Sequence, residues 1–150
     1  MRVVIQRVSR ANVNIDSKIY SSIKKGLLIL LGIETEDNQE DIDWICGKIA
    51  RLRIFDDSNH VMNLSVQDIQ GNCLVVSQFT LHASTKKGNR PSYIRAAPPE
   101  IAIPLYEKFI SSLQKETQLE VKTGVFGANM QVELCNDGPV TIIIDSKNRE

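Results

Sequence analysis

The sequence predicts an α/β fold in which mostly antiparallel β-sheet, forming a barrel-like layer, packs against two main helices. Short β-type runs bounded by turn residues recur along the whole chain, whereas apolar residues follow a helical period in only two windows. A chain of 150 residues with 42% hydrophobic composition can bury one core without disulfide bonds. We therefore expect a single compact domain over residues 1–150.

The first third of the chain is predicted to begin with strands. Residues 2–8 and 12–15 are short β-type runs, and residues 19–23 form another after an Asp-Ser turn. Residues 27–33, with the sequence LLILLGI, are apolar almost throughout, as is typical of a central strand buried on both faces.

A helix is predicted from about residue 40 to residue 53. Its apolar residues recur at helical spacing after the capping-type residues Asp37 and Asn38. They are Ile42, Ile45, Cys46, Ile49 and Leu52. The carboxylates between residues 34 and 43 are explained as the solvated start of this helix.

The second half is predicted to contain a turn at residues 56–59 and a strand from residue 74 that continues through Thr80. Residues 83–99 form a long polar loop, which a compact domain seldom keeps without a function. A second helix follows Pro99, with Pro104 either in its first turn or at a kink. Strands are expected at residues 119–123, 130–135 and 140–144, the last two joined by a turn at 136–139.

Composition narrows the functional classes. Eighteen basic residues balance eighteen acidic residues, so there is no overall basic excess of the kind that nucleic-acid-binding proteins usually have. A small local group of cations would still suffice for the tip of an RNA. The two histidines have no metal-site spacing, and we expect neither a metal nor a cofactor.

Localisation is inferred from the cysteines and from the N-terminal residues. The three cysteines are widely spaced and form no CxxC pair, which indicates reduced core thiols. The chain has no apolar stretch near 18 residues, and its first residues do not resemble a cleavable leader. We therefore expect a cytoplasmic protein.

Candidate nucleophiles are limited to Ser77, Thr80 and the cysteines. In a strand, His82 would share a face with Thr80, but a histidine at a strand end is more often a surface residue, and no GxSxG elbow is present. An enzyme without obvious catalytic groups must rely on positioning and on chemistry that its substrate supplies, such as the ribose hydroxyl next to a tRNA ester. The Gly138-Pro139 pair, taken alone, indicates only a turn.

Four segments, in this order, together resemble the D-aminoacyl-tRNA deacylase family. They are VSQFTL at 76–81, GNRPSY at 88–93, TGVFGANM at 123–130 and NDGPVT at 136–141. An opening with QRV at 6–8 and LLGI at 30–33 extends the resemblance over nearly the whole chain. His82 stands where a smaller residue is expected, which argues against a catalytic role for it.

The resemblance implies a homodimeric hydrolase that acts on the aminoacylated 3′ end of tRNA. It assigns catalysis to Ser77, Gln78 and Thr80, where backbone groups face the ester carbonyl as an oxyanion-type site. It also assigns substrate binding to one set of residues and suggests tRNA binding for another. The substrate-binding residues are Phe79, Phe126, Met130, Gly138 and Pro139, and the tRNA-binding candidates are Lys86, Lys87 and Arg90, with Arg95 beside them.

The resemblance further implies that Gly138 and Pro139 form a cis peptide and enter the partner subunit's active site. There they would reject L-amino acids and leave D-amino acids and glycine, including glycine mischarged on tRNA-Ala, to be hydrolysed. Two alternatives stay open: a Thr80 or Ser77 nucleophile that forms an acyl-enzyme, and a non-catalytic tRNA-binding module. For the loop cations, a merely solvated loop is an equal alternative.

Overall fold

Strand β1 (Arg2–Ile15) organises the main sheet of the computed structural model, which describes residues 1–149. Its first half pairs with β3 (Gly26–Gly32), its second half pairs with β2 (Lys18–Ile23), and β8 (Gln131–Asp145) pairs with both halves. All three pairings are antiparallel. The two runs that the sequence separates at residues 9–11 are therefore one strand, which continues past an irregular register with β8.

The other side of the sheet is parallel. β6 (Asn72–Ser77) lies beside β3, and β7 (Val121–Thr123) lies beside β6, giving the order β2-β1-β3-β6-β7. β3 is almost entirely buried between β1 and β6, as its apolar run predicts. A separate hairpin of β4 (Phe55–Asp56) and β5 (Met62–Leu64) was not predicted.

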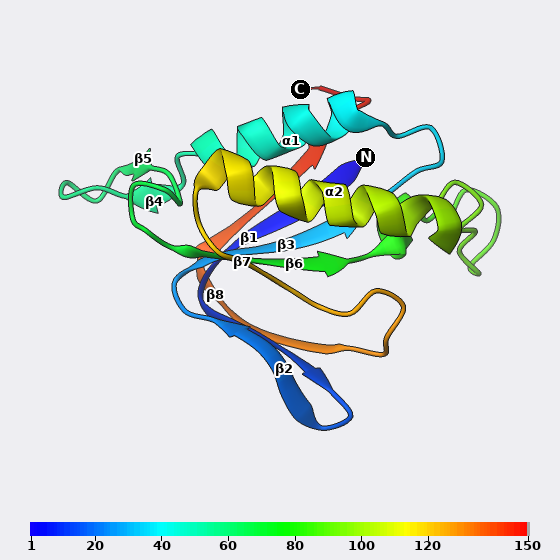
Figure 1. Cartoon of the computed structure of the whole chain (residues 1–150), viewed down its shortest axis with the longest axis horizontal. Helices are drawn as coiled ribbons and strands as arrows, with labels where there is room; N and C mark the ends of the chain where they lie inside the picture. Colours follow the sequence, from blue (N-terminus) through cyan, green and yellow to red (C-terminus); the bar gives the residue numbers. More distant parts are fainter. Residues whose placement is uncertain (150) are drawn as a thin grey trace.

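Helices α1 (Gln39–Arg51) and α2 (Pro99–Thr117) lie side by side over one face of the sheet (Figure 1). The main core fills the space between them and this face. A smaller core of Val8, Ala11, Val13, Ile23, Leu28, Leu74 and Val76 occupies the other face, where β1, β2 and β8 curl. The predicted α/β class, with a barrel-like, mostly antiparallel layer and two helices, is confirmed.

The start of α1 is more buried than the sequence suggests. Asn38 caps the helix in a capping box with Asp41, as the capping-type residues predict. Asp37 accepts a hydrogen bond from the Met1 amino group, and both Asp37 and Asp41 are buried. Burial alone would raise the pKa of Asp41, but hydrogen bonds involving Ser146, Lys147 and the Asn38 amide outweigh it and lower that pKa. The interpretation of this cluster as simply solvated is therefore wrong for these two carboxylates.

Two further expectations are corrected by the backbone. The NDGP segment is not a turn between two strands, because residues 131–145 form one strand whose two halves both run antiparallel to β1. Pro104 is the sixth residue of α2 and lies beyond its first turn, because the helix begins at Pro99.

No helix among residues 1–149 is long and apolar enough to cross a membrane.

Candidate functional site

The candidate site begins where β6 ends. Ser77 is the last residue of that strand, and the amide of Gln78 donates a hydrogen bond of 2.7 Å to the carbonyl of Leu31 in β3. The chain then turns into a short 3-10 helix, η1 (Phe79–His82). The prediction of a strand through Thr80 is therefore wrong in its last three residues.

The start of η1 presents donors and a hydroxyl next to one another. Amides at the beginning of a helix have no acceptor within it, and the Phe79 and Thr80 amides have no hydrogen-bond acceptor among residues 1–149. The side-chain amide of Gln78 donates to the Thr80 hydroxyl and orients it. This arrangement is suited to receiving an oxygen that gains negative charge.

His82 lies on another side of η1 and is fully buried, which contradicts the expectation of a surface residue. Residues two apart in a 3-10 helix are about 240° apart around the axis, so His82 does not share the face of Thr80. Its Nδ1 atom lies 3.2 Å from Glu34 Oε1, but neither ring nitrogen has a well-directed hydrogen-bond partner among the described residues. A Thr80–His82 nucleophile and base pair is therefore not formed.

Two hollows flank the turn that contains Ser77, Gln78 and Phe79. The smaller, of about 80 Å³, is mainly apolar and is completed by Phe126 and Gly127 together with residues of β3 and α2. The larger, of about 280 Å³, is completed by residues 127–130, including Met130. The structure thus brings together Ser77, Gln78, Phe79, Phe126 and Met130, five of the residues singled out in the sequence.

Tyr106 of α2, which the sequence analysis did not single out for the site, supports this wall. Its hydroxyl donates a 2.9 Å hydrogen bond to the carbonyl of Val75, and its ring meets Phe126 edge-on at 5.8 Å between centroids. Burial raises the pKa of the Tyr106 phenol well above its usual value, so the group stays neutral. In the sequence, Tyr106 lies among the apolar residues on one side of the second helix, a pattern that indicates a core residue and not a site residue.

Gly138 and Pro139 lie at a distance from these hollows within the same chain. They are exposed, and the peptide bond between them is cis. Register places them level with Arg7 on β1, whereas Ser77 is level with Val3. The separation is roughly 13 Å along the strands and roughly 14 Å across the three intervening strand spacings.

Arg7 holds the backbone that presents this pair. Its guanidinium donates to the carbonyl of Asp137 at 2.7 Å and to the carbonyl of Ile54 at 2.6 Å, and the side chain is almost fully buried. Gly138 has φ of +142°, and a Cβ there would lie 3.1 Å from the Arg7 guanidinium and 2.8 Å from a methyl group of Val140. In the sequence, Arg7 could have been noticed only as a charged residue inside the apolar β-type run of residues 2–8.

The remaining candidates, Lys86, Lys87 and Arg90, are exposed on the loop between η1 and α2. Residues 84 and 92 pair through two backbone hydrogen bonds, so the tip of this loop is a small hairpin. The structure does not bring the three cations into contact with the hollows.

Comparison with known proteins decides the family. The family model described as D-Tyr-tRNA(Tyr) deacylase matches residues 4–145. The chain belongs to this family. A "D-aminoacyl-tRNA deacylase" of Flavobacterium psychrophilum is 69% identical over 100% of both chains. The family and the kind of enzyme predicted from the sequence are thereby confirmed.

Two solved structures share the fold of this deacylase family member. One is described as "c-Myc DNA Unwinding Element Binding Protein", with 42% identity, a TM-score of 0.91, and coverage of 97% of this chain and 98% of that one. The other is described as "Structural Analysis of a probable eukaryotic D-amino acid tRNA deacylase", with 15% identity, a TM-score of 0.82, and coverage of 95% and 97%. The second supports the fold alone.

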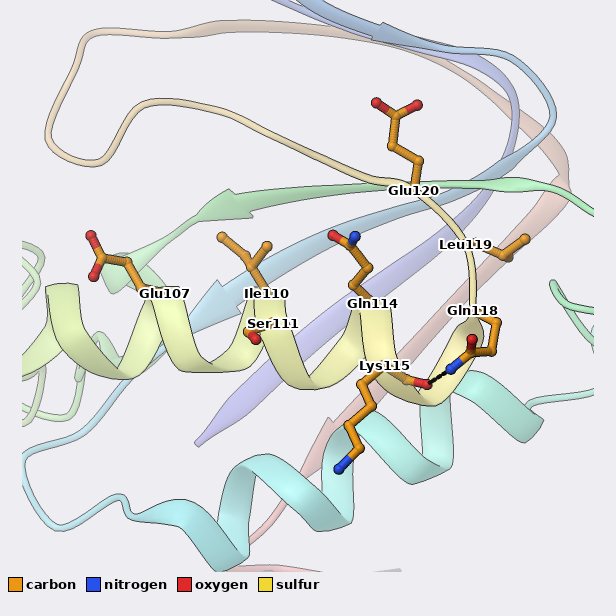
Figure 2. Close-up of a pocket in the computed structure, with 8 residues that line it drawn as sticks. All are labelled: Glu107, Ile110, Ser111, Gln114, Lys115, Gln118, Leu119 and Glu120. Atoms are coloured by element: carbon orange, nitrogen blue, oxygen red, sulfur yellow. Dashed lines mark hydrogen bonds between the residues drawn. The ribbon is translucent and has the colours of Figure 1, made fainter.

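Other features of this family member are less suited to a reaction centre. A hollow of about 670 Å³, larger than the two at the η1 turn, is an open groove along the end of α2, lined by mixed charges that include Glu107, Lys115 and Glu120 (Figure 2). None of the predicted site residues lines it. No group of three His, Cys, Asp or Glu side chains among residues 1–149 is arranged to hold a metal ion.

The cysteines are poor nucleophiles in this fold. Burial raises the pKa of the Cys73 thiol to about 12, and burial with nearby carboxylates raises that of Cys46 further. These two are core thiols as predicted, whereas Cys135 is partly exposed, and all three are free.

Proposed function

We propose that this chain hydrolyses the ester between a D-amino acid and the 3′-terminal ribose of tRNA, releasing the free amino acid and the tRNA. The observation that carries the proposal is the start of η1, with unpaired amides beside a small apolar hollow. Such a site can stabilise charge on an ester oxygen without supplying a nucleophile of its own. It suits a substrate that carries an activating hydroxyl.

In the proposed reaction, a water molecule attacks the ester carbonyl carbon while the carbonyl oxygen faces the amides of Phe79 and Thr80. The neighbouring ribose hydroxyl orients this water and relays its proton. The bond between the carbonyl carbon and the ribose oxygen then breaks, and the ribose oxygen takes the proton. Ser77 and Gln78 shape the turn, and the Thr80 hydroxyl, oriented by Gln78, supports the developing oxyanion.

The amino acid is proposed to be held at its two polar ends. The carbonyl of Phe126 accepts no hydrogen bond from residues 1–149 and is free to bind the substrate ammonium group. Phe79, Phe126 and Met130 wall the site. With ammonium and carbonyl fixed, D and L side chains must leave the α-carbon in different directions.

Chiral selection is assigned to Gly138 and Pro139 of a second subunit. They are too far from the hollow of their own chain to touch its substrate, and they are exposed. In a homodimer, the partner's pair would occupy the direction that an L side chain needs, so L-amino acids are excluded sterically while D-amino acids are tolerated broadly. Glycine has no side chain to exclude, and glycine mischarged on tRNA-Ala should also be removed.

The exposed cations Lys86, Lys87 and Arg90 are proposed to contact tRNA phosphates. We place the activity in the cytoplasm, where charged tRNA is used. The reaction as proposed requires neither a metal nor a cofactor.

Replacing Gly138 with Val tests the selection mechanism. At φ +142° a branched side chain is strained, and its Cβ would meet Val140 and Arg7, so the pair must move. We expect loss of D-ester hydrolysis or loss of L-ester rejection, with the fold retained but the urea unfolding midpoint lowered modestly, because the substitution strains the backbone at this position. Full D-selectivity in Gly138→Val would disprove the proposed chiral wall.

A non-catalytic tRNA-binding module is the alternative. It would bind charged tRNA without accelerating loss of any ester, and it would explain the exposed cations but not the open amides of η1.

A further inference from the structure

An aromatic platform lies at the rim of the proposed ester site. The rings of Phe79 and Tyr93 meet edge-to-face with centroids 5.0 Å apart, and they remain 55% and 40% exposed. The neighbouring Ile94 is 89% exposed. Because Phe79 lines both hollows at the η1 turn, Tyr93 continues the apolar surface outward from the site.

The segment that carries Tyr93 and Ile94 is strongly basic. Residues 83–98 contain Lys86, Lys87, Arg90 and Arg95 and no acidic residue, although the whole chain has zero formal net charge. Glu34 lies 3.8 Å from Arg95 and offsets part of that charge. This segment therefore has a formal net charge of +4, and the other residues together, with 14 cations and 18 acidic residues, have a net charge of −4.

Beyond the platform, the same segment forms a concavity of about 540 Å³. Its walls include Lys86, Lys87, Ile94 and Arg95, together with serine, threonine and alanine side chains of the loop hairpin. An exposed aromatic surface next to a basic concavity is suited to a single-stranded nucleic acid, whose bases can stack on the rings while its phosphates contact the cations.

Backbone hydrogen bonds hold this surface in place. Ser84 and Ser92 exchange two of them, at 2.8 and 2.9 Å, and the Ala97 amide donates to the carbonyl of Ile33 at 2.9 Å. The Ala96 amide also donates to the carbonyl of Tyr93 at 3.0 Å. The segment is therefore fixed to the residue that follows β3, the strand next to β6, so binding on it costs little ordering.

We propose that the platform, through the Tyr93 ring and with Ile94 beside it, stacks the unpaired nucleotides that precede the terminal adenosine of a charged tRNA, with their phosphates in the basic concavity. The inference rests on the proposed function, since a 3′ ester in the hollow brings the preceding single strand to this rim. Aromatic faces and cations are the usual means of binding single-stranded RNA without reading its sequence.

The test uses binding to uncharged tRNA, which requires no hydrolysis. Purified full-length chain is titrated with intact tRNA and with the same tRNA lacking its unpaired 3′ nucleotides, for the unaltered protein, Tyr93→Ala and Tyr93→Phe. We expect Tyr93→Ala to weaken binding of intact tRNA about ten-fold, as loss of one stacked base does, and Tyr93→Phe to retain it. Truncated tRNA should bind more weakly and should not distinguish the variants.

Two controls separate stacking from other causes. Tyr20→Ala removes a tyrosine of β2 that is 55% exposed, more than the 40% of Tyr93, and should leave tRNA affinity unchanged. The dependence of affinity on salt should keep its slope in Tyr93→Ala, whereas Lys87→Ala should reduce that slope by about one, as for a lost phosphate contact.

The proposal is overturned if Tyr93→Ala binds intact tRNA as well as the unaltered protein, or if it weakens truncated tRNA equally. A change in the oligomeric state of Tyr93→Ala by light scattering, with unchanged tRNA affinity per dimer, would assign the platform to a contact between subunits instead. Absence of ester hydrolysis combined with the expected binding results would contradict the proposed reaction and leave this inference standing.

Discussion

At the residue scale, two arginines, Arg2 partly exposed and Arg7 almost fully buried, link segments that are distant in sequence. Arg2 donates to Asp145 at the end of β8 and, at 2.8 Å, to the carbonyl of Leu81 in η1. Arg7 performs a similar task for the strand segment at Asp137. These contacts fix the turn after β6 and the Gly138-Pro139 pair relative to the sheet, which is what positioning requires in a site without a catalytic triad.

The residues proposed for the site could be named from the sequence, but their structural surroundings could not. Ser77, Gln78 and Phe79 were expected near Phe126 and Met130, and these residues do line the two hollows at the η1 turn. His82 was misplaced because a strand was assumed, and the change to a 3-10 helix turns that side chain into the core. Such a change depends on backbone packing against Gly32 and Glu34 rather than on residue type.

Replacing Thr80 with Ala distinguishes the two catalytic routes. If the substrate's hydroxyl assists the reaction, kcat should fall by no more than roughly 10²- to 10³-fold, as after loss of one oxyanion contact. A nucleophilic Thr80 would instead cost on the order of 10⁴-fold or more. The measurement is single-turnover hydrolysis of D-tyrosyl-tRNA, with Ser77→Ala as the companion variant and mass spectrometry to look for an acyl-enzyme; a trapped acyl group would contradict the substrate-assisted route.

Replacing His82 with Ala should destabilise the fold by about 2–4 kcal/mol, because it leaves a cavity beneath η1. Urea unfolding at neutral pH gives the free-energy difference. His60→Ala, at an exposed position, is the matched control and should change stability by less than about 1 kcal/mol. Equal effects of the two replacements would show that the buried ring does not support the turn.

At the element scale, the sequence pattern predicted two strands, at residues 130–135 and 140–144, where the structure has the single strand β8. An Asn-Asp-Gly-Pro sequence ordinarily ends a strand, but here pairing with β1 on both sides of it carries the strand through. The two halves of β1 were separated for the same reason, because the irregular register interrupts their alternation. In both strands, continuity depends on pairing between residues that are far apart in sequence, and the local sequence pattern does not indicate such pairing. The helices and the buried β3, whose patterns are local and strong, were predicted to within a few residues.

The end of β8 gives a pH-dependent prediction. Burial would raise the pKa of Asp145, but hydrogen bonds from the Lys147 amide and from Arg2, with the charge of Arg2, outweigh it and lower that pKa below 3.8. A lowered folded-state pKa stabilises the fold fully above the unfolded value, and this contribution is lost as pH falls through the folded value.

Asp145→Asn should therefore cost about 1–2 kcal/mol at pH 7 and make stability less dependent on pH below about 4. Urea unfolding of both proteins between pH 7 and pH 3 measures this, since their curves should converge at the acid end. Parallel curves across the whole range would contradict the role of the Arg2–Asp145 pair.

At the scale of the whole molecule, the proposed ester site and the Gly138-Pro139 pair proposed for chiral selection lie apart within one chain. The hollows lie level with Val3, and the Gly138-Pro139 pair lies level with Arg7 on another strand. A symmetric dimer can bring one chain's pair to the other chain's hollow, and by symmetry the reverse. Composition alone could not indicate this, because it carries no information on assembly.

Mixed dimers test that arrangement. Gly138→Val removes the wall. Gly127→Trp fills the hollow at a position where a Cβ meets no atom within 4 Å, although its φ of +77° strains any side chain there. Neither variant alone should hydrolyse D-esters selectively, but a co-refolded equal mixture should recover about a quarter of the D-selective sites, since half of the dimers are mixed and each has one complete site. No recovery, with mixed dimers demonstrated by native mass spectrometry, would contradict supply of the pair in trans.

The central claim is most directly tested by charging tRNA separately with D-tyrosine, L-tyrosine and glycine and following ester loss with catalytic amounts of metal-free protein. The account predicts rapid loss of the D-tyrosyl and glycyl esters, with the L-tyrosyl ester decaying only at its spontaneous rate. Equal loss of D- and L-tyrosyl esters would contradict selection by a backbone wall, and loss of none would contradict the proposed reaction itself.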